Sequence, residues 1–225
     1  VTIKRMRKSI DNNLGDISTN GGGPTTLSGS GDALSMSGGA GVTFAGGMWL
    51  KGLLATPVGT FFSPSVTLEA AVTVDPATVT EGTVATITGG YGPALVITVG
   101  ADGKPRARTW NVFTPGVWRA SVVGATAIND GRPHHLAATW TTATGTLALV
   151  VDGVGAGSVV STAGAGKYEA VGTHVTAGGA SHTDPLTGTV AYVAAFPSVL
   201  SGARSAEHAA GVLDGFTGET VEERI

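Results

Sequence analysis

The sequence predicts an all-β fold: an antiparallel β-sandwich or jelly roll with one short C-terminal helix and an extended N-terminal arm. Short apolar stretches with a period of two recur between turn residues, which is typical of sandwiches. Glycine accounts for 36 of 225 residues and charged residues for only 13%, a composition that favours turns over long helices. The length suffices for a sizeable core. Because cysteine is absent, disulfides, thiolate metal sites and cysteine nucleophiles are excluded.

The first half of the chain predicts one long strand and a hairpin. Residues 65–74 place apolar side chains at every second position: Val66, Leu68, Ala70, Val72 and Val74. This alternation predicts a half-buried strand. Residues 95–99 continue the pattern and run into Asp102-Gly103, a dipeptide that favours a hairpin turn. The returning strand is therefore expected at 104–110.

The second half predicts another hairpin and a late strand. Residues 135–140 and 146–151 flank a short polar loop, and the second stretch ends in Asp152-Gly153. This pattern indicates a hairpin with a turn at each end. Residues 188–196 are mostly apolar, which indicates a strand buried on both faces.

One helix is expected, at residues 201–213. Ser201 or Ser205 would cap its start, because a serine hydroxyl accepts a hydrogen bond from the free N–H groups of the first turn. Gly211 is expected to interrupt it.

Composition divides the chain into three segments. Residues 1–31 join a basic decapeptide to a stretch rich in Gly, Ser and Thr, so they are expected to form an arm. Residues 32–210 hold the alternating stretches and form the jelly-roll domain. Residues 211–225 are acidic and are expected to be a tail ordered by a partner.

The charge distribution argues against two kinds of partner. The formal net charge is −3, and four of the thirteen Lys and Arg residues lie within the first eight positions. The rest of the chain is therefore more acidic than the total, so nucleic-acid binding is not expected. No apolar run approaches the roughly 20 residues of a membrane-spanning helix, so no membrane span is expected.

Three stretches, in order, share a pattern with one known superfamily. Residues 33–44 and 65–72 are similar to its opening strand and its "FTLEAWV" strand. Residues 130–153, with DGRPHHLAATW and TLALVVDG, are similar to "DGxWHHVAVTW…GxLxLYVDG", the most specific signature. Residues 186–201 are similar to the closing "FxGxIDEVRIYxxxLS". Residues 32–210 therefore resemble the laminin-G or concanavalin A-like jelly-roll superfamily, which includes lectins and glucanases.

The resemblance also bears on calcium. Members that bind Ca²⁺ use carboxylates and carbonyls at the sandwich rim, because this hard cation needs several oxygen ligands. The family's Asp-Tyr is absent from residues 38–42, and its Asp-Glu is replaced by Ala191-Tyr192. No cofactor is therefore expected. Asp130, Asp152 and Asp184 are loop carboxylates that could still build a calcium site, but turn residues that bond their own backbone are the favoured interpretation.

No enzyme is expected. Glycanases of this fold carry carboxylates at alternate positions on one strand, since acid and nucleophile must face the same sugar about 5.5 Å apart. Glu69 stands alone between Leu68 and Ala70, and the sequence has no Gly-x-Ser-x-Gly, phosphate-binding loop or His-Glu-x-x-His.

The histidines indicate structural roles. His134 and His135 are adjacent on a predicted strand and should point to opposite faces, which suits hydrogen bonding better than joint metal ligation. His174, His182 and His208 are isolated in the sequence and are expected at the surface or in turns.

Charged and aromatic side chains alternate after the Asp102-Gly103 turn: Lys104, Arg106, Arg108 and Trp110. An extended strand would put them on one face, where the indole could stack on a sugar ring and the cations bond hydroxyls or acidic substituents. His182 and Asp184, in a loop that the family topology places on the rim, are further candidates by fold analogy. The alternative is an ordinary solvent-facing strand, charged against edge pairing.

The N-terminal pattern suggests a role. A basic decapeptide before a Gly/Ser/Thr-rich stretch resembles the arms by which virion proteins attach to a capsid or tail. With no cysteine and no recognisable export signal, the chain resembles a bacteriophage structural protein, such as a minor tail or head-decoration component. Its expected partners are other virion proteins, through arm and tail, and host-surface glycans; a homo-oligomer is compatible.

Two alternatives remain open. The chain could be a carbohydrate-binding module of a secreted or cell-surface protein. It could also be a glycan-degrading enzyme with a catalytic pair drawn from loops, although no paired carboxylate motif supports this.

Overall fold

The computed structural model describes much of the chain: residues 17–20, 26–30, 33–37, 42–45, 49–53, 65–78, 80–89, 92–110, 118–141, 143–161, 172–178, 186–196 and 198–216. Within these ranges, no helix is long and apolar enough to cross a membrane.

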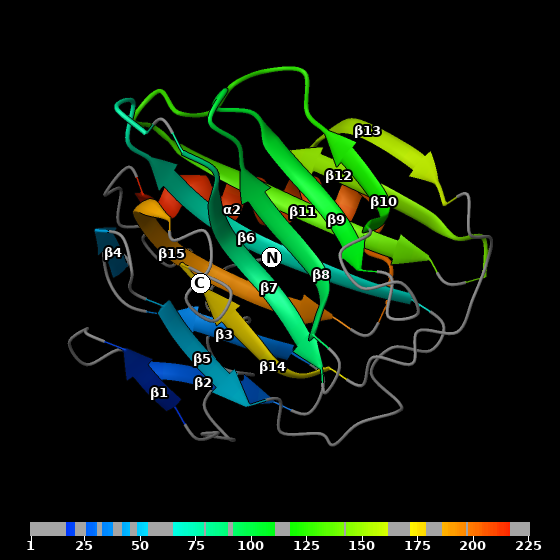
Figure 1. The fold of residues 1–225 in the computed structure, drawn as a ribbon, viewed down its shortest axis with the longest axis horizontal. Helices are drawn as coiled ribbons and strands as arrows, with labels where there is room; N and C mark the ends of the chain where they lie inside the picture. The colour runs from blue at the N-terminus through cyan, green and yellow to red at the C-terminus, as the bar shows by residue number, and fades with distance from the viewer. Residues whose placement is uncertain are drawn as a thin grey trace, which may run out of the picture.

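Two antiparallel sheets stack on each other (Figure 1). Among the described residues the first sheet has seven strands. In spatial order they are β1 (Ile17–Asn20), β5 (Trp49–Leu53), β14 (Gly172–Ala177), β7 (Gly82–Gly89), β8 (Gly92–Val99), β9 (Pro105–Trp110) and β10 (Trp118–Val123).

The second sheet has eight strands in the part of the chain that is described. In spatial order they are β13 (Val154–Val160), β12 (Thr146–Val151), β11 (Pro133–Thr141), β6 (Ser65–Val74), β15 (Thr187–Phe196), β3 (Ala33–Ser37) and β2 (Thr26–Ser30), and β4 (Val42–Ala45) also pairs with β15. The predicted sandwich is confirmed. Strands β1 and β2 belong to the stretch expected to be an arm, and they pair with β5 and β3.

The sandwich core lies between the two sheets. Strand β6 contributes the predicted alternate residues, which are buried together with side chains of β7, β8, β11 and β15. Trp140 on β11 is the largest of the fully buried side chains. The prediction that β6 is only half-buried is wrong, because its other face, with Thr67, Glu69 and Ala71, is fully buried too.

Helix α2 (Gly202–Phe216) lies behind the second sheet, on the side away from the first (Figure 1). The backbone N–H of Arg204 donates to Ser201 Oγ over 3.2 Å, which confirms Ser201 as the N-cap. The helix runs past Gly211, so the predicted interruption is wrong. Ser205 and Ala209 are buried, which indicates that this side of the helix packs on the sheet.

The outer face of the second sheet alternates small and polar residues under α2. Cross-strand pairing places Ala137, Glu69 and Ala194 in one row. His135, Ala71 and Tyr192 form the next row. The three alanines are buried but lie outside the sandwich core. Because they are small, the helix can approach the sheet closely enough to enclose the polar side chains between them.

The Asp152-Gly153 turn, predicted from the sequence, packs against helix α2. Asp152 and Gly153 have φ of 51° and 77°, as expected for a two-residue hairpin turn. A Cβ on Gly153 would lie 2.8 Å from Ala206 Cα and 3.4 Å from Ala209 Cβ. Glycine is therefore required both by the backbone conformation and by contact with α2.

We expect Gly153→Ala to lower the free energy of unfolding by about 2 kcal/mol, because positive φ and overpacking each disfavour a side chain. Urea unfolding measures the loss. Gly155→Ala is the matched control in the same hairpin, since a Cβ there meets no atom within 4 Å. Equal losses in the two variants would contradict this explanation.

Candidate functional site

Strand β9 sends alternate side chains to opposite faces. Pro105, Ala107 and Thr109 are buried, whereas Arg106 and Arg108 are half-buried on the outer face of the first sheet. The common face expected for these two arginines is thus present. The structure describes the backbone of Trp110 but not its side chain, and His182 and Asp184 lie outside the described residues.

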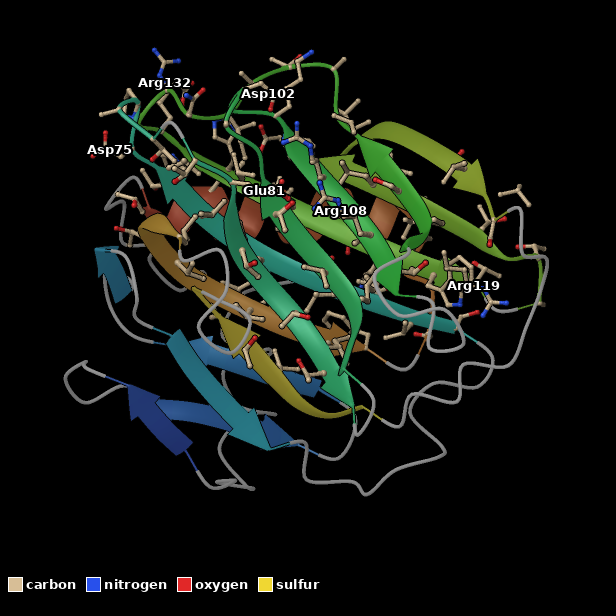
Figure 2. The ribbon with its side chains drawn as sticks, viewed as in Figure 1. Asp75, Glu81, Asp102, Arg108, Arg119 and Arg132 are labelled. Atoms are coloured by element: carbon tan, nitrogen blue, oxygen red, sulfur yellow. The ribbon has the colours of Figure 1, made fainter. Side chains whose placement is uncertain are left out.

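Two carboxylates bind these arginines. Arg106 Nη2 lies 2.9 Å from Asp102 Oδ1, and its Nη1 donates to the carbonyl of Lys104 over 3.4 Å. Arg108 binds Glu81 through both nitrogens, with Nη1 on Oε1 and Nη2 3.3 Å from Oε2. Figure 2 shows Glu81 and Arg108 turned toward each other in front of the first sheet.

Glu81 is held from a second direction. Thr98, on the outer face of β8, donates from Oγ1 to Glu81 Oε1 over 2.9 Å, so this carboxylate is fixed between β8 and β9. The backbone N–H of Lys104, followed by Arg106, lowers the pKa of Asp102 below its usual value. Asp102 therefore stays ionised at neutral pH.

These five residues form the arginine–carboxylate face: Glu81, Asp102, Lys104, Arg106 and Arg108. Two arginines pair with two carboxylates, and Lys104 beside them adds one net positive charge. An acidic substituent of a ligand would have to compete with the protein's own carboxylates. Neutral hydroxyls can instead accept from the guanidinium groups and donate to the carboxylate oxygens.

Two of the three calcium candidates meet at a histidine. His134 Nδ1 lies 2.8 Å from Asp152 Oδ2, and Nε2 lies 3.1 Å from Asp130 Oδ1. Asp130 also accepts from the backbone N–H two residues on, as a turn residue does, and Asp152 accepts from the N–H of His135. Asp184 lies outside the described residues. In the described part of the chain, no three His, Cys, Asp or Glu side chains could hold a metal ion.

This trio is a surface ion cluster. The hydrogen bond to Asp152, outweighing burial and helped by Asp130, raises the pKa of His134. Asp130 has a lowered pKa because of the N–H of Arg132 and the bond to His134. Burial raises the pKa of Asp152, but the bonds from His134 and from the N–H of His135 outweigh it, so the net shift is downward.

We expect His134→Gln to destabilise the protein most at mildly acidic pH. A raised histidine pKa contributes stability that is fully present below the ordinary value of 6.5 and lost as pH rises through the folded value. The lowered pKa values of Asp130 and Asp152 contribute stability above pH 3.8, and this stability is lost as the pH falls through the folded values. Unfolding in urea should show a loss of about 1 kcal/mol at pH 5.5 and less at pH 8.5.

Arg132→Gln, which keeps the backbone N–H donor beside the same trio, is the control for this measurement. A larger loss at pH 8.5 than at pH 5.5 for His134→Gln would contradict the assigned ion pairs.

A second ionisable cluster is buried under helix α2. His208 Nδ1 lies 2.8 Å from Glu69 Oε2, His135 Nε2 lies 3.7 Å from the same oxygen, and the Tyr192 hydroxyl lies 3.5 Å from it. The side chains of Glu69 and His135 are 0% exposed and that of His208 is 8% exposed. The cluster therefore joins β6, β11, β15 and α2.

This cluster corrects one expectation. His208 is not a surface residue, because α2 brings this histidine onto the sheet, where it binds Glu69. The expectation for the histidine pair is confirmed: His134 points to the surface trio and His135 into the buried cluster.

Glu69 is ionised in this environment. Burial raises the pKa of its carboxyl, but the hydrogen bond from His208 and the charge of the His135 and His208 imidazoles outweigh burial, so the net shift is downward. Burial and the negative charge of Glu69 raise the pKa of Tyr192 well above its usual value. Tyr192 is therefore a neutral donor.

Glu69, Asp130 and Asp152 are not arranged as the carboxylate pair that glycoside hydrolysis uses. Glu69 is enclosed and bound to imidazoles, while Asp130 and Asp152 share one histidine. A general acid needs a raised pKa, and all three have lowered values.

Comparison with known families agrees with this architecture. Residues 51–204 match the family Laminin_G_3, described as the concanavalin A-like lectin/glucanases superfamily. The chain belongs to this superfamily. The resemblance seen in the sequence motifs is thereby confirmed at the level of the superfamily, and its lectin-like fold is the one described above. No curated protein sequence matches the chain.

Several solved structures share the fold at low identity. The botulinum neurotoxin serotype D binding domain has a TM-score of 0.62 at 9% identity, covering 90% of this chain and 48% of that one. The binding domain of botulinum neurotoxin DC in complex with SialylT has 0.61 at 6%, covering 88% and 47%. The SAP-like pentraxin of Limulus polyphemus has 0.55 at 14%, covering 80% and 82%. The chain thus spans about half the length of the neurotoxin domains.

Proposed function

We propose that this superfamily member is a non-enzymatic protein that binds glycans through the arginine–carboxylate face. One observation carries the proposal: these charged side chains are fixed by bonds to one another on the outer face of a lectin-like sandwich. Fixed donors and acceptors suit the hydroxyls of a sugar ring. Trp110, at the end of the same strand, would add an aromatic surface, and His182 and Asp184 would contribute from their loop.

The proposal that the protein is not an enzyme rests on its acidic residues. In the described ranges, the carboxylates of Glu69, Asp130 and Asp152 are each bound to imidazoles and have lowered pKa values. Such groups hold their negative charge and do not supply a proton to a glycosidic oxygen. The fold also supports a binding role, since a neurotoxin binding domain of this fold was solved in complex with SialylT.

We propose further that the protein acts in a bacteriophage virion, as a minor tail or head-decoration component. The basic decapeptide and the Gly/Ser/Thr-rich stretch after it support this role. Residues 1–31 and 211–225 would contact other virion proteins. Mass spectrometry of purified particles tests the location: recovery of the chain at a constant copy number is expected, and its absence would favour an extracellular or cell-surface module.

Binding is tested with the full chain on a glycan array and on cell envelopes of the host, with calcium and with a chelator. We expect saturable binding that the chelator does not change, because the described residues include no cluster of three His, Cys, Asp or Glu side chains that could hold a metal ion. Loss of binding in the chelator would assign a calcium site, and release of reducing ends from a bound polysaccharide would make the protein an enzyme. No binding under either condition would leave the sandwich as an assembly scaffold.

A further inference from the structure

Helix α2 packs on the outer face of the second sheet, outside the apolar core between the two sheets. The core between the sheets is apolar, and it excludes the alanines and polar residues of the outer face of the second sheet. Releasing the helix would separate His208 from Glu69 but leave the apolar core between the two sheets in place. The contact between α2 and the sheet is therefore a separate unit whose strength can change without unfolding the domain.

The centre of this contact contains one carboxylate and two imidazoles. Three strands and the helix contribute: β6 supplies Glu69, β11 His135, β15 Tyr192, and α2 both Ser205 and His208, while β13, which also packs on α2, carries no titratable side chain. The ring of Phe196 on β15 lies 5.7 Å from that of His208. The charged residues that α2 places next to this contact, Arg204 and Glu207, pair with each other over 3.1 Å and are exposed.

Several polar atoms of this cluster are buried but make no hydrogen bond. Glu69 Oε1, both ring nitrogens of His135 and Ser205 Oγ are buried without a hydrogen-bond partner. Such groups cost free energy when they are enclosed and regain it when water reaches them. A cluster of this kind is sensitive to any change in its charge.

We propose that Glu69, His135 and His208 form a pH-sensitive latch that releases helix α2 at mildly acidic pH while the sandwich stays folded. One carboxylate balances one imidazolium. A second proton on the two imidazoles leaves an uncompensated positive charge between sheet and helix, and a buried unpaired charge is strongly unfavourable. Release of α2 lets water solvate both rings. The latch thus opens on acidification.

The direction of the effect follows from proton linkage. A state that binds more protons becomes more populated as the pH falls, and release of the helix makes both rings accessible to water and to protons.

Hydrogen exchange of the full chain, read by mass spectrometry as protection factors, tests the latch. Protection factors remove the intrinsic pH dependence of exchange. The peptide covering 202–216 should lose protection by at least tenfold between pH 7.5 and pH 5.0, while peptides from β8 and β9 keep theirs. Unchanged protection of α2, or simultaneous loss in α2 and the first sheet, would overturn the proposal.

Three variants connect the effect to the cluster. His135→Gln with His208→Gln keeps hydrogen-bonding side chains but takes up no proton, so the pH step should disappear. Glu69→Gln removes the balancing charge, so release should begin at higher pH. His134→Gln changes the surface trio beside the Asp152-Gly153 turn, which contacts α2. It therefore tests whether that trio causes the pH step, and it should leave the step in place. A pH step that persists in the double histidine variant, or vanishes in His134→Gln, would assign the effect to other groups.

Discussion

Glu69→Ala is expected to lower the free energy of unfolding by about 3–5 kcal/mol at pH 7, the range for removing one partner of a buried ion pair. The carboxylate is 0% exposed, and the neighbouring His135 is as well. Its removal deprives His208 Nδ1 of its 2.8 Å partner and Tyr192 of its acceptor. A cavity adds to the loss, because the side chain lies between sheet and helix.

A comparison of variants separates lost pairing from lost volume. Replacing Glu69, His135 and His208 together by leucine removes every charge and refills the space, so it should cost less than Glu69→Ala alone, as buried ion clusters often show. Urea unfolding at pH 7 measures both. If the triple variant is the less stable one, the cluster stabilises the fold by more than its own desolvation, and the expected order is wrong.

The sequence predicts most of the local structure of the sandwich. Asp102-Gly103 and Asp152-Gly153 predict turns because few dipeptides accept their positive φ, and Gly103 and Gly153 have φ of 73° and 77°. The alternation on β9 predicts which side chains face outward, since the strand period is fixed at two. These inferences depend only on neighbouring residues.

The contacts that the sequence does not predict connect segments that are far apart in the chain. Glu69 and His208 are 139 residues apart, and no local signal indicates that α2 lies over β6. The one available signal is in Ser65–Val74 itself, where the small, apolar Ala71 shares the outer face with Glu69 and makes that face less polar than an exposed strand requires. Glu81 precedes β7, and its place beside Arg108 follows only from the order of β7, β8 and β9 in the sheet.

Arg108→Ala is expected to weaken glycan binding by ten- to a hundredfold if the arginine–carboxylate face is the binding site. A hydrogen bond to a charged group contributes about 1.5–3 kcal/mol, and each 1.4 kcal/mol is tenfold in affinity. Glu81→Gln should weaken binding less, because the amide can still bond Thr98 and a hydroxyl but no longer fixes the guanidinium by charge. Folding should be nearly unaffected, since the pair is partly exposed and contributes about 1 kcal/mol at most.

Arg204→Ala is the matched control, because it removes another arginine–carboxylate pair, that with Glu207, from helix α2 behind the second sheet. Titration of each variant with the glycan found on the array gives the ratio of dissociation constants. Equal weakening by Arg108→Ala and Arg204→Ala would show a nonspecific charge effect, and unchanged affinity in Arg108→Ala would move the binding site away from this face. A selective loss in Arg108→Ala, with thermal stability retained, would place the ligand on the outer face of β8 and β9.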